Sequence, residues 1–351
     1  MRSRAAAATP VTPAEAETLF AGLQEAKGIV AAVSGGPDSS CLMHLLAAWR
    51  ETGARPPVVV ATVDHGLRPE SAGEARRVAR WAKALGFRHR ILIWEGDKPK
   101  TGVQEAAREA RYRLLADLAR RAGASHIVTA HTHDDQAETV VMRLVRGTGV
   151  GGLAGMRPAI IRDGIVLVRP FLGVAKMRLV ATCAAGGWPF LDDPSNADPR
   201  FARAHLRAHL MPLLAREGLT ADRLVALAER ARRDADALDA RAVAVLDAAR
   251  TPAADAAPDA ELTLDAARLA AEPDAILLRV VARAMAEVLG PETKPVRLER
   301  FEARILGDLR GALHRGQALR MNLSGAMLHL KDGRLAVRPE PPRRRGRERA
   351  K

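Results

Sequence analysis

The chain has 351 residues, more than one ordinary compact domain needs, so two or three domains are expected. Its 55 Lys and Arg residues against 41 Asp and Glu leave a formal net charge of +14, which favours a polyanionic partner such as nucleic acid or a nucleotide. No apolar run approaches the length that spans a bilayer, which excludes a transmembrane protein, and with only 6 Phe, 4 Trp and 1 Tyr a stacking surface for single-stranded RNA is not expected.

The first 190 residues alternate short apolar runs with longer helical patterns. Five Val- and Ile-rich runs predict buried strands at 28–33, 58–63, 89–94, 126–130 and 165–168. Helical patterns lie between them, at 38–50, 70–85, 103–122 and 135–146. This alternation predicts an α/β fold with a doubly wound parallel sheet, which binds its ligands at the carboxyl ends of the strands.

The pattern changes after Trp188. Turn residues cluster at 192–199, helical periodicity starts near Thr220, and a second amphipathic stretch stops near Gly290. From 318 to 337 the apolar period becomes two, and Lys331–Asp332–Gly333–Arg334 predicts a hairpin turn. The predicted parts are an extension (1–25), the α/β domain (26–215), a helical domain (216–290), a small α+β module (291–340) and a basic disordered tail (341–351).

One motif follows the first predicted strand and opens a helix. It reads Ser34–Gly35–Gly36–Pro37–Asp38–Ser39. The two glycines allow positive φ and a close approach to an anion, Pro37 suits a first helical turn, and the serines and the helix N-terminus offer donors. Asp38 would repel a phosphate unless a cation lay between them, which predicts Mg²⁺. The lysine of a GxxxxGK[ST] loop is missing, so γ-phosphate transfer of that type is not indicated.

This loop resembles the SGGxDS loop of the N-type ATP pyrophosphatases, the PP-loop superfamily with the adenine nucleotide alpha hydrolase-like fold. The resemblance implies that an oxygen is activated by adenylation and that pyrophosphate is released. It implies ATP and Mg²⁺ as cofactors, with the six loop residues binding ATP and Asp38 holding the metal.

Further motifs narrow the resemblance. They are VDHGLR at 63–68, EAAREARY at 105–112, AHTHDDQAET at 130–139, DDPSN at 192–196 and HLRAHLMPLL at 205–214. Together, over about residues 28–214, they resemble the tRNA(Ile)-lysidine synthetase family. Two positions depart from the family pattern, Thr132 in place of a His and Ala204 in place of an Asn, and neither is one of the carboxylates.

The resemblance implies a two-step ligation. ATP adenylates the carbon-2 oxygen of the wobble cytidine in the tRNA(Ile) with anticodon CAU, and the ε-amine of free L-lysine then attacks carbon 2, giving lysidine and AMP. The α/β domain would be catalytic and the helical domain would bind tRNA. We expect a cytoplasmic protein without a secretory signal or a membrane partner; the sequence leaves the oligomeric state open, a dimer being one option.

Three residues are the candidates for catalysis. Asp135 and Glu138 lie three apart on one helical face and could hold and deprotonate the lysine ammonium. The resemblance places them, with Arg111, near lysine and the base, and we hypothesise that Arg111 stabilises negative charge at the phosphate or the base oxygen. The alternative for the acids is a solvated helix start, and for Arg111 a surface ion pair with Glu109 or Asp117.

Other functions stay open. His131, His133 and Asp135 make HxHxD, close to a zinc-hydrolase motif, but Gln136 stands where its last His would be. A PP-loop tRNA thiolase would need cysteines, whereas Cys41 and Cys183 suit small core positions. A non-catalytic RNA-binding protein would fit the basic charge but would not need the loop and the paired acids.

Overall fold

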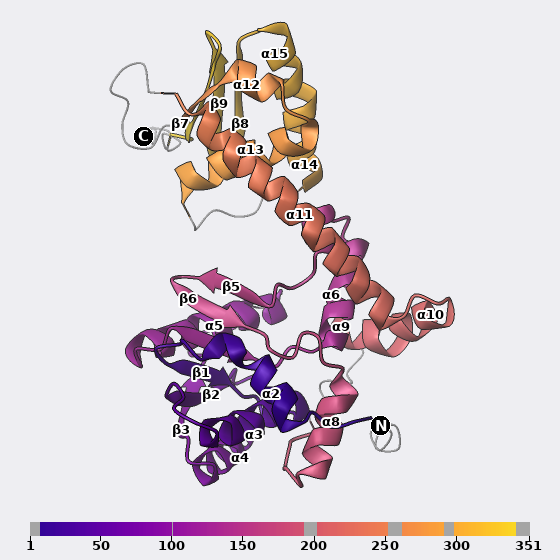
Figure 1. Ribbon diagram of the computed structural model, residues 1–351. Coiled ribbons are helices and arrows are strands. Elements are labelled where there is room, and N and C mark those ends of the chain that lie inside the picture. Colours follow the sequence, from indigo (N-terminus) through magenta and orange to yellow (C-terminus); the bar gives the residue numbers. More distant parts are fainter. Residues whose placement is uncertain (1–7, 100, 193–201, 252–261, 291–297, 342–351) are drawn as a thin grey trace, which may run out of the picture. The chain divides into compact units, whose positions relative to one another are not determined.

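The computed structural model describes residues 8–99, 101–192, 202–251, 262–290 and 298–341. The chain divides into two compact units, the first made of residues 1–146 and 154–229 and the second of 147–153 and 230–351 (Figure 1). The turn residues predicted at 193–199 and the basic tail from 342 onwards lie outside the described residues.

A six-stranded sheet lies at the centre of the first unit, in the order β3-β2-β1-β4-β6-β5. Its strands are β1 (Ile29–Ala32), β2 (Val58–Asp64), β3 (Arg88–Ile93), β4 (His126–Thr129), β5 (Ala159–Arg162) and β6 (Ile165–Val168). Neighbours are parallel except β5 and β6. The chain order reverses between β1 and β4, where doubly wound sheets bind ligands. The predicted fold class is confirmed.

The antiparallel edge strand β5 is a finding that the sequence interpretation missed. Its sequence, Ala159–Ile160–Ile161–Arg162, is apolar but short, and the strand is mostly exposed at the sheet edge instead of buried like the predicted strands. The signal was the turn Asp163–Gly164 before β6, because both residues have positive φ, 52° and 76°, as the tight turn of a hairpin requires.

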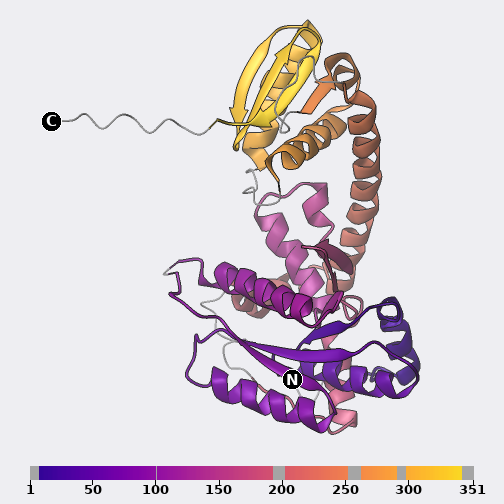
Figure 2. The same cartoon turned by 90° about the vertical axis from the view of Figure 1, so that its left-hand side faces the viewer.

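Helices cover both faces of this sheet (Figure 2). They are α2 (Pro13–Leu19), η1 (Ala21–Leu23), α3 (Pro37–Glu51), α4 (Ser71–Ala84), α5 (Val103–Arg121), α6 (His133–Val145) and α8 (Lys176–Ala185). Ile29 and Ala31 of β1 share a core with α3, α4 and α8, whereas Val30 shares one with α5. Both faces of β1 are therefore buried, which explains its uninterrupted apolar sequence.

The first unit also contains the segment that precedes β1 and the helices that follow residue 201. The described part of the segment predicted as an extension packs into the core, where Phe20 and Leu23 are fully buried. After residue 201 follow α9 (Ala202–His205), the π-helical segment η3 (Leu206–Leu210), α10 (Met211–Arg216) and the first part of α11 (Ala221–Ala249).

The second unit has a four-stranded antiparallel sheet in the order β7-β10-β9-β8. Its elements besides α11 are α7 (Val150–Leu153), β7 (Leu262–Asp265), α12 (Ala266–Ala270), α13 (Asp274–Leu289), α14 (Leu298–Glu302), the π-helical η4 (Ala303–Leu309), α15 (Arg310–Arg315), β8 (Leu319–Leu323), β9 (Ala326–Lys331) and β10 (Arg334–Pro339). The predicted hairpin is confirmed, since Asp332 and Gly333 join β9 to β10 with φ of 48° and 71°. Leu246, Val281 and Leu335 belong to one core, so the segments predicted as 216–290 and 291–340 pack together.

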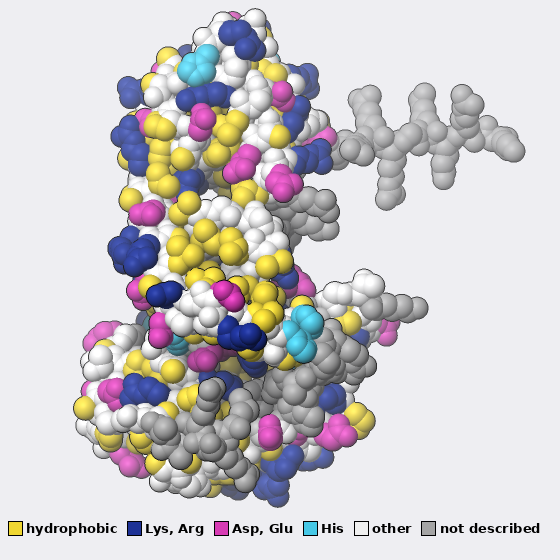
Figure 3. Space-filling model, turned by 90° about the vertical axis from the view of Figure 1, so that its right-hand side faces the viewer, with side chains coloured by type: hydrophobic (Ala, Val, Ile, Leu, Met, Phe, Trp, Pro, Cys, Tyr) yellow, Lys and Arg dark blue, Asp and Glu magenta, His cyan; other side chains and the backbone are white. Residues whose placement is uncertain are grey.

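The described surface carries charges of both signs. On the face drawn in Figure 3, Lys and Arg side chains are scattered among acidic and apolar ones and form no single continuous patch. No helix of the described residues has the length and apolar character required to cross a membrane.

Candidate active site

In the loop between β1 and α3, only one of the two glycines has a backbone conformation that requires glycine. Gly35 has φ of +94°, and a Cβ there would lie 2.6 Å from Leu191 Cδ1 and 2.8 Å from Val78 Cγ2. Gly36 caps α3 with an ordinary φ of −66°, and its nearest Cβ contact would be 3.9 Å away. The expectation of positive φ is therefore confirmed for Gly35 and wrong for Gly36.

Serine side chains hold this loop together. The Ser39 hydroxyl accepts from the backbone N–H groups of Ser34 (3.2 Å) and Gly35 (3.1 Å) and donates to the Gly36 carbonyl (3.1 Å). Pro37 occupies the first turn of α3, as predicted. Ser34 has an exposed side chain, so its hydroxyl remains accessible to a ligand.

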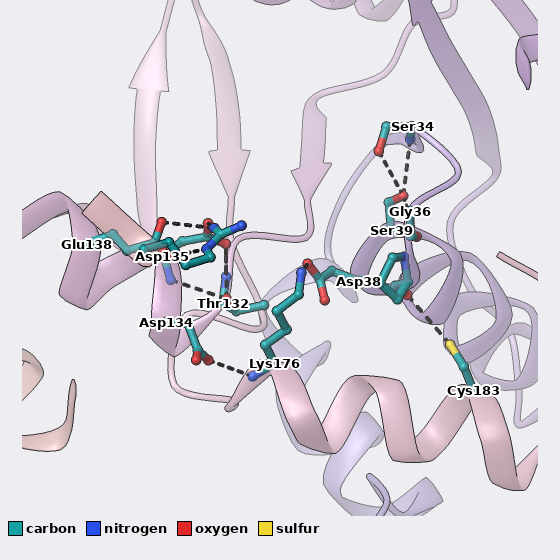
Figure 4. Close-up of polar contacts among 12 residues, drawn as sticks. Ser34, Gly36, Asp38, Ser39, Thr132, Asp134, Asp135, Glu138, Lys176 and Cys183 are labelled. Carbon is teal, nitrogen blue, oxygen red and sulfur yellow. Dashed lines mark hydrogen bonds and ion pairs between the residues drawn. The ribbon is translucent and has the colours of Figure 1, made fainter. Parts of the chain in front are cut away.

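Asp38 points from the first turn of α3 toward Lys176 at the start of α8 (Figure 4). Its Oδ2 accepts from Lys176 Nζ at 2.6 Å, while its Oδ1 is buried and has no partner among the described residues. Burial raises the pKa of Asp38, and the charge of Lys176 counteracts this. The Lys176 backbone N–H donates to Asp134 Oδ2 (2.7 Å), which ties α8 to α6.

Asp135 is held by the residue that caps its helix. Thr132 is the buried N-cap of α6, and its N–H and hydroxyl donate to Asp135 Oδ2 at 2.9 and 3.0 Å. Burial would raise the pKa of Asp135, but these hydrogen bonds and nearby positive charges lower it below its usual value. Thr132, a departure from the family pattern, thus forms a capping box with the candidate acid.

Glu138 lies one turn further along α6 and is almost completely buried. Arg207 of η3 donates to both of its oxygens, Nε to Oε1 at 2.6 Å and a terminal nitrogen to Oε2 at 3.0 Å. Arg203 Nε lies 3.5 Å from Oε2. The bonds to Glu138 raise the pKa of Arg207, whereas burial raises the pKa of Glu138 and the hydrogen bonds and charge of Arg207 oppose that rise. Asp135 Oδ1 lies 3.9 Å from Arg207.

Arg111 lies on α5, and its Nε is buried without a hydrogen-bond partner among the described residues. Burial lowers its pKa, yet a guanidinium stays charged at neutral pH. The surface ion pair considered as an alternative is not formed with Asp117, which pairs with Arg120 instead. His131 lies near both Arg111 and Asp135, and burial followed by the charge of Arg111 lowers its pKa to about 3.

These features agree with comparisons to known proteins. The sequence matches the family model of the PP-loop domain over residues 10–214. It is 57% identical to the tRNA(Ile)-lysidine synthase of Methylobacterium nodulans, over 92% of this chain and 93% of that protein. It is 56% identical to the tRNA(Ile)-lysidine synthase of Methylobacterium sp. strain 4-46, over 97% and 98%. The chain belongs to the tRNA(Ile)-lysidine synthase family.

The fold of this lysidine synthase family member is also found in a solved structure. The U34-tRNA thiolase NcsA of Methanococcus maripaludis matches with a TM-score of 0.53 and 14% identity, over 62% of this chain and 77% of that one. At this identity the likeness concerns the fold alone. The family and the fold class predicted from the sequence are both confirmed.

As a PP-loop member of the lysidine synthase family, the protein uses ATP with Mg²⁺. Asp38 fits the metal, because its unpartnered, buried Oδ1 is an oxygen ligand of the kind that Mg²⁺ prefers. Within the described ranges no three His, Cys, Asp or Glu side chains gather into a metal site. Mg²⁺ would therefore be held by Asp38 together with nucleotide phosphates, as is usual for this ion.

The structure adds three basic residues that sequence reasoning did not assign to the site. The sequence leaves Arg207 equally open as a tRNA contact or a solvent-facing helix residue, and Arg203 only precedes Ala204 in the chain. In the structure both contact Glu138. Lys176 lies outside every motif of the sequence. Its signal was present, since a lysine in the first turn of a helix that has no acidic residue there opposes the helix dipole.

The residues of the zinc alternative serve other contacts. His131 Nδ1 is 2.9 Å from Thr129 Oγ1, His133 Nε2 is 3.3 Å from Asp222 Oδ1, and Asp135 is bound by Thr132. The interpretation of both cysteines as core residues is confirmed, because each has no exposed surface. These side chains stabilise the lysidine synthase fold around the site.

Proposed function

We propose that this protein ligates L-lysine to carbon 2 of the wobble cytidine of the tRNA(Ile) with anticodon CAU, producing lysidine, AMP and pyrophosphate. The observation that carries the proposal is the arrangement of two motifs on neighbouring strands. The loop Ser34–Ser39 follows β1, the acids of α6 follow β4, and β1 and β4 pair in parallel. ATP bound to the loop and a lysine amine bound to the acids of α6 would then both lie next to one cytidine base, at the carboxyl edge of the sheet.

In the first step the cytidine carbon-2 oxygen attacks the α-phosphorus of ATP. The O–P bond forms while the bond between that phosphorus and pyrophosphate breaks. The exposed Ser34 hydroxyl, the backbone N–H of Gly36 and the N-terminal turn of α3 after Pro37 bind phosphate oxygens, while Gly35 and Pro37 shape the loop. Ser39 keeps the loop in shape, and Asp38 would hold Mg²⁺, which would supply positive charge to the phosphates.

In the second step the ε-amine of lysine attacks carbon 2, and the bond from that carbon to the oxygen of AMP breaks. Asp135 is ionised at neutral pH, so it can hold the ammonium and accept its proton as the amine attacks. Glu138 adds negative charge and orients Arg207. Arg111 stabilises the negative charge that develops on the phosphate or the base oxygen.

The test is incubation with ATP, radiolabelled lysine and a CAU tRNA(Ile) transcript. We expect labelled tRNA and one AMP per lysine incorporated. Asp38→Asn should abolish both AMP release and labelling. Asp135→Asn should abolish labelling while adenylated tRNA still forms, which separates the two steps. Labelled tRNA at the wild-type rate in Asp135→Asn would refute the role of that residue.

The alternatives predicted from the sequence are a PP-loop thiolase and a non-catalytic RNA-binding protein. A thiolase would modify the tRNA when given a sulfur donor, but both cysteines are fully buried. A mere binder would retain the tRNA without consuming ATP. Incorporation of sulfur in place of lysine, or binding without AMP release, would overturn the proposal.

A further inference from the structure

A second group of arginines surrounds the single tyrosine of the chain. The guanidinium carbons of Arg108 and Arg111 both lie 5.2 Å from the centre of the Tyr112 ring. Burial would raise the pKa of Tyr112, but the charges of Arg111, Arg108 and Arg169 outweigh it and lower the pKa. Arg169 directly follows β6, at the carboxyl end of that strand. The cluster is therefore formed by α5 and by the residue that follows β6.

This cluster has unused hydrogen-bonding capacity. Arg169 is only 5% exposed, and although one of its terminal nitrogens donates to the Arg157 carbonyl, its Nε has no partner. The Nε of Arg111 is likewise buried and has no partner among the described residues, whereas the Tyr112 hydroxyl interacts with Arg111 and Arg169. Buried donors without a partner are costly, so their presence points to a ligand that supplies acceptors.

The charges of the cluster are also unbalanced. The described part of the chain provides no ion pair between an acid and Arg108, Arg111 or Arg169, and the three repel one another. A carboxylate needs one guanidinium for a bidentate contact, whereas a phosphate offers several oxygens to several guanidiniums. The loop proposed to bind ATP precedes α3, and α3 packs on the face of the sheet opposite α5. The arginine cluster on α5 is therefore separate from the proposed ATP loop.

We propose that Arg108, Arg111 and Arg169, gathered at Tyr112, bind a phosphodiester group of the RNA substrate next to the reacting nucleotide. The cluster lies beside His131, which in turn lies near Asp135, so a backbone phosphate held here would position the neighbouring base at the acids of α6. The inference rests on the proposed function for the identity of the RNA, and it assigns Arg108 and Arg169 a role in substrate binding.

The test measures binding of the CAU tRNA transcript at several salt concentrations, without ATP or lysine. Arg108→Ala should weaken binding about tenfold. It should also reduce the slope of log K against log salt by about 0.7 to 1, the value for one lost phosphate contact. The matched control is Arg113→Ala, because Arg113 is exposed on the same helix and should change neither quantity. Arg108→Lys keeps the charge and should restore the slope but not the full affinity.

Lysine binding, measured by calorimetry on the same proteins, should be unchanged in Arg108→Ala. Weaker lysine binding with normal tRNA binding would overturn the inference and assign the cluster to the amino-acid carboxylate. Unchanged tRNA binding in a folded Arg108→Ala protein would overturn it as well. Because binding is measured separately from ligation, a protein that fails to make lysidine but shows the Arg108 dependence contradicts only the proposed function.

Discussion

Asp135 and Glu138 are one helical turn apart on α6, yet their surroundings differ. Both Glu138 oxygens bind Arg207, whereas Asp135 Oδ1 has only a 3.9 Å contact with that residue. In the proposed mechanism, Asp135 would therefore offer the oxygen to a lysine ammonium, and Glu138 would act through the guanidinium that it orients.

Thr132 should matter more for its hydroxyl than for its size. Replacing it with alanine removes the N-cap of α6, which costs about 1 kcal/mol of folding free energy, and releases Asp135. Thr132→Ser keeps the hydroxyl and is expected to retain nearly all the stability. Urea denaturation of the two variants checks this, and equal stability of both would contradict the capping role.

His131 should make the protein sensitive to acid. Its pKa is about 3 in the folded state and about 6.5 in an unfolded chain, so the unfolded state binds more protons as pH falls from 6.5 toward 3. Stability is therefore lost on acidification, by about 1 kcal/mol at pH 5.5. His131→Asn should lose less than wild type between pH 7.5 and 5.5 in urea denaturation. An identical loss would show that His131 titrates normally.

At the scale of elements, the loop and the start of α8 face each other across the site. Gly35 is required because Val78 of α4 and Leu191 leave no room for a side chain, so packing from distant segments determines the loop shape. Lys176 at the start of α8 then balances Asp38 at the start of α3. Neither contact could be predicted from the local sequence.

The two glycines of the loop should therefore differ when replaced by alanine. Gly35→Ala combines a left-handed φ with a 2.6 Å clash, so we expect a loss of about 1–3 kcal/mol and of ATP binding. Gly36→Ala meets no atom closer than 3.9 Å and should keep its stability. Thermal melting with and without ATP distinguishes them. A stable Gly35→Ala protein would refute the steric argument.

At the scale of the whole molecule, each unit has its own hydrophobic core, and on the face drawn in Figure 3 the basic side chains are scattered rather than concentrated. A net charge of +14 acts on any polyanion through many weak contacts. Such contacts release counterions, and the affinity then depends on the salt concentration.

Binding of tRNA should accordingly weaken steeply with salt. If about six phosphates are neutralised, the binding constant should fall by about 10³ between 50 and 200 mM salt. Filter binding of the CAU transcript at four salt concentrations measures this slope. A flat response would contradict electrostatic binding of tRNA by this surface.

Much of the fold and the nucleotide loop could be predicted, because their signals are local. Apolar runs define strands, and the strand–turn–helix string at Ser34–Ser39 contains its own turn and helix start. The sequence by itself thus determined the family, the parallel sheet and the candidate acids. Tertiary structure alone decided the partners: Lys176 for Asp38, Arg207 for Glu138, and the arginines around Tyr112. These partners are separated by up to 138 residues along the chain, and only the packing of whole elements brings them together.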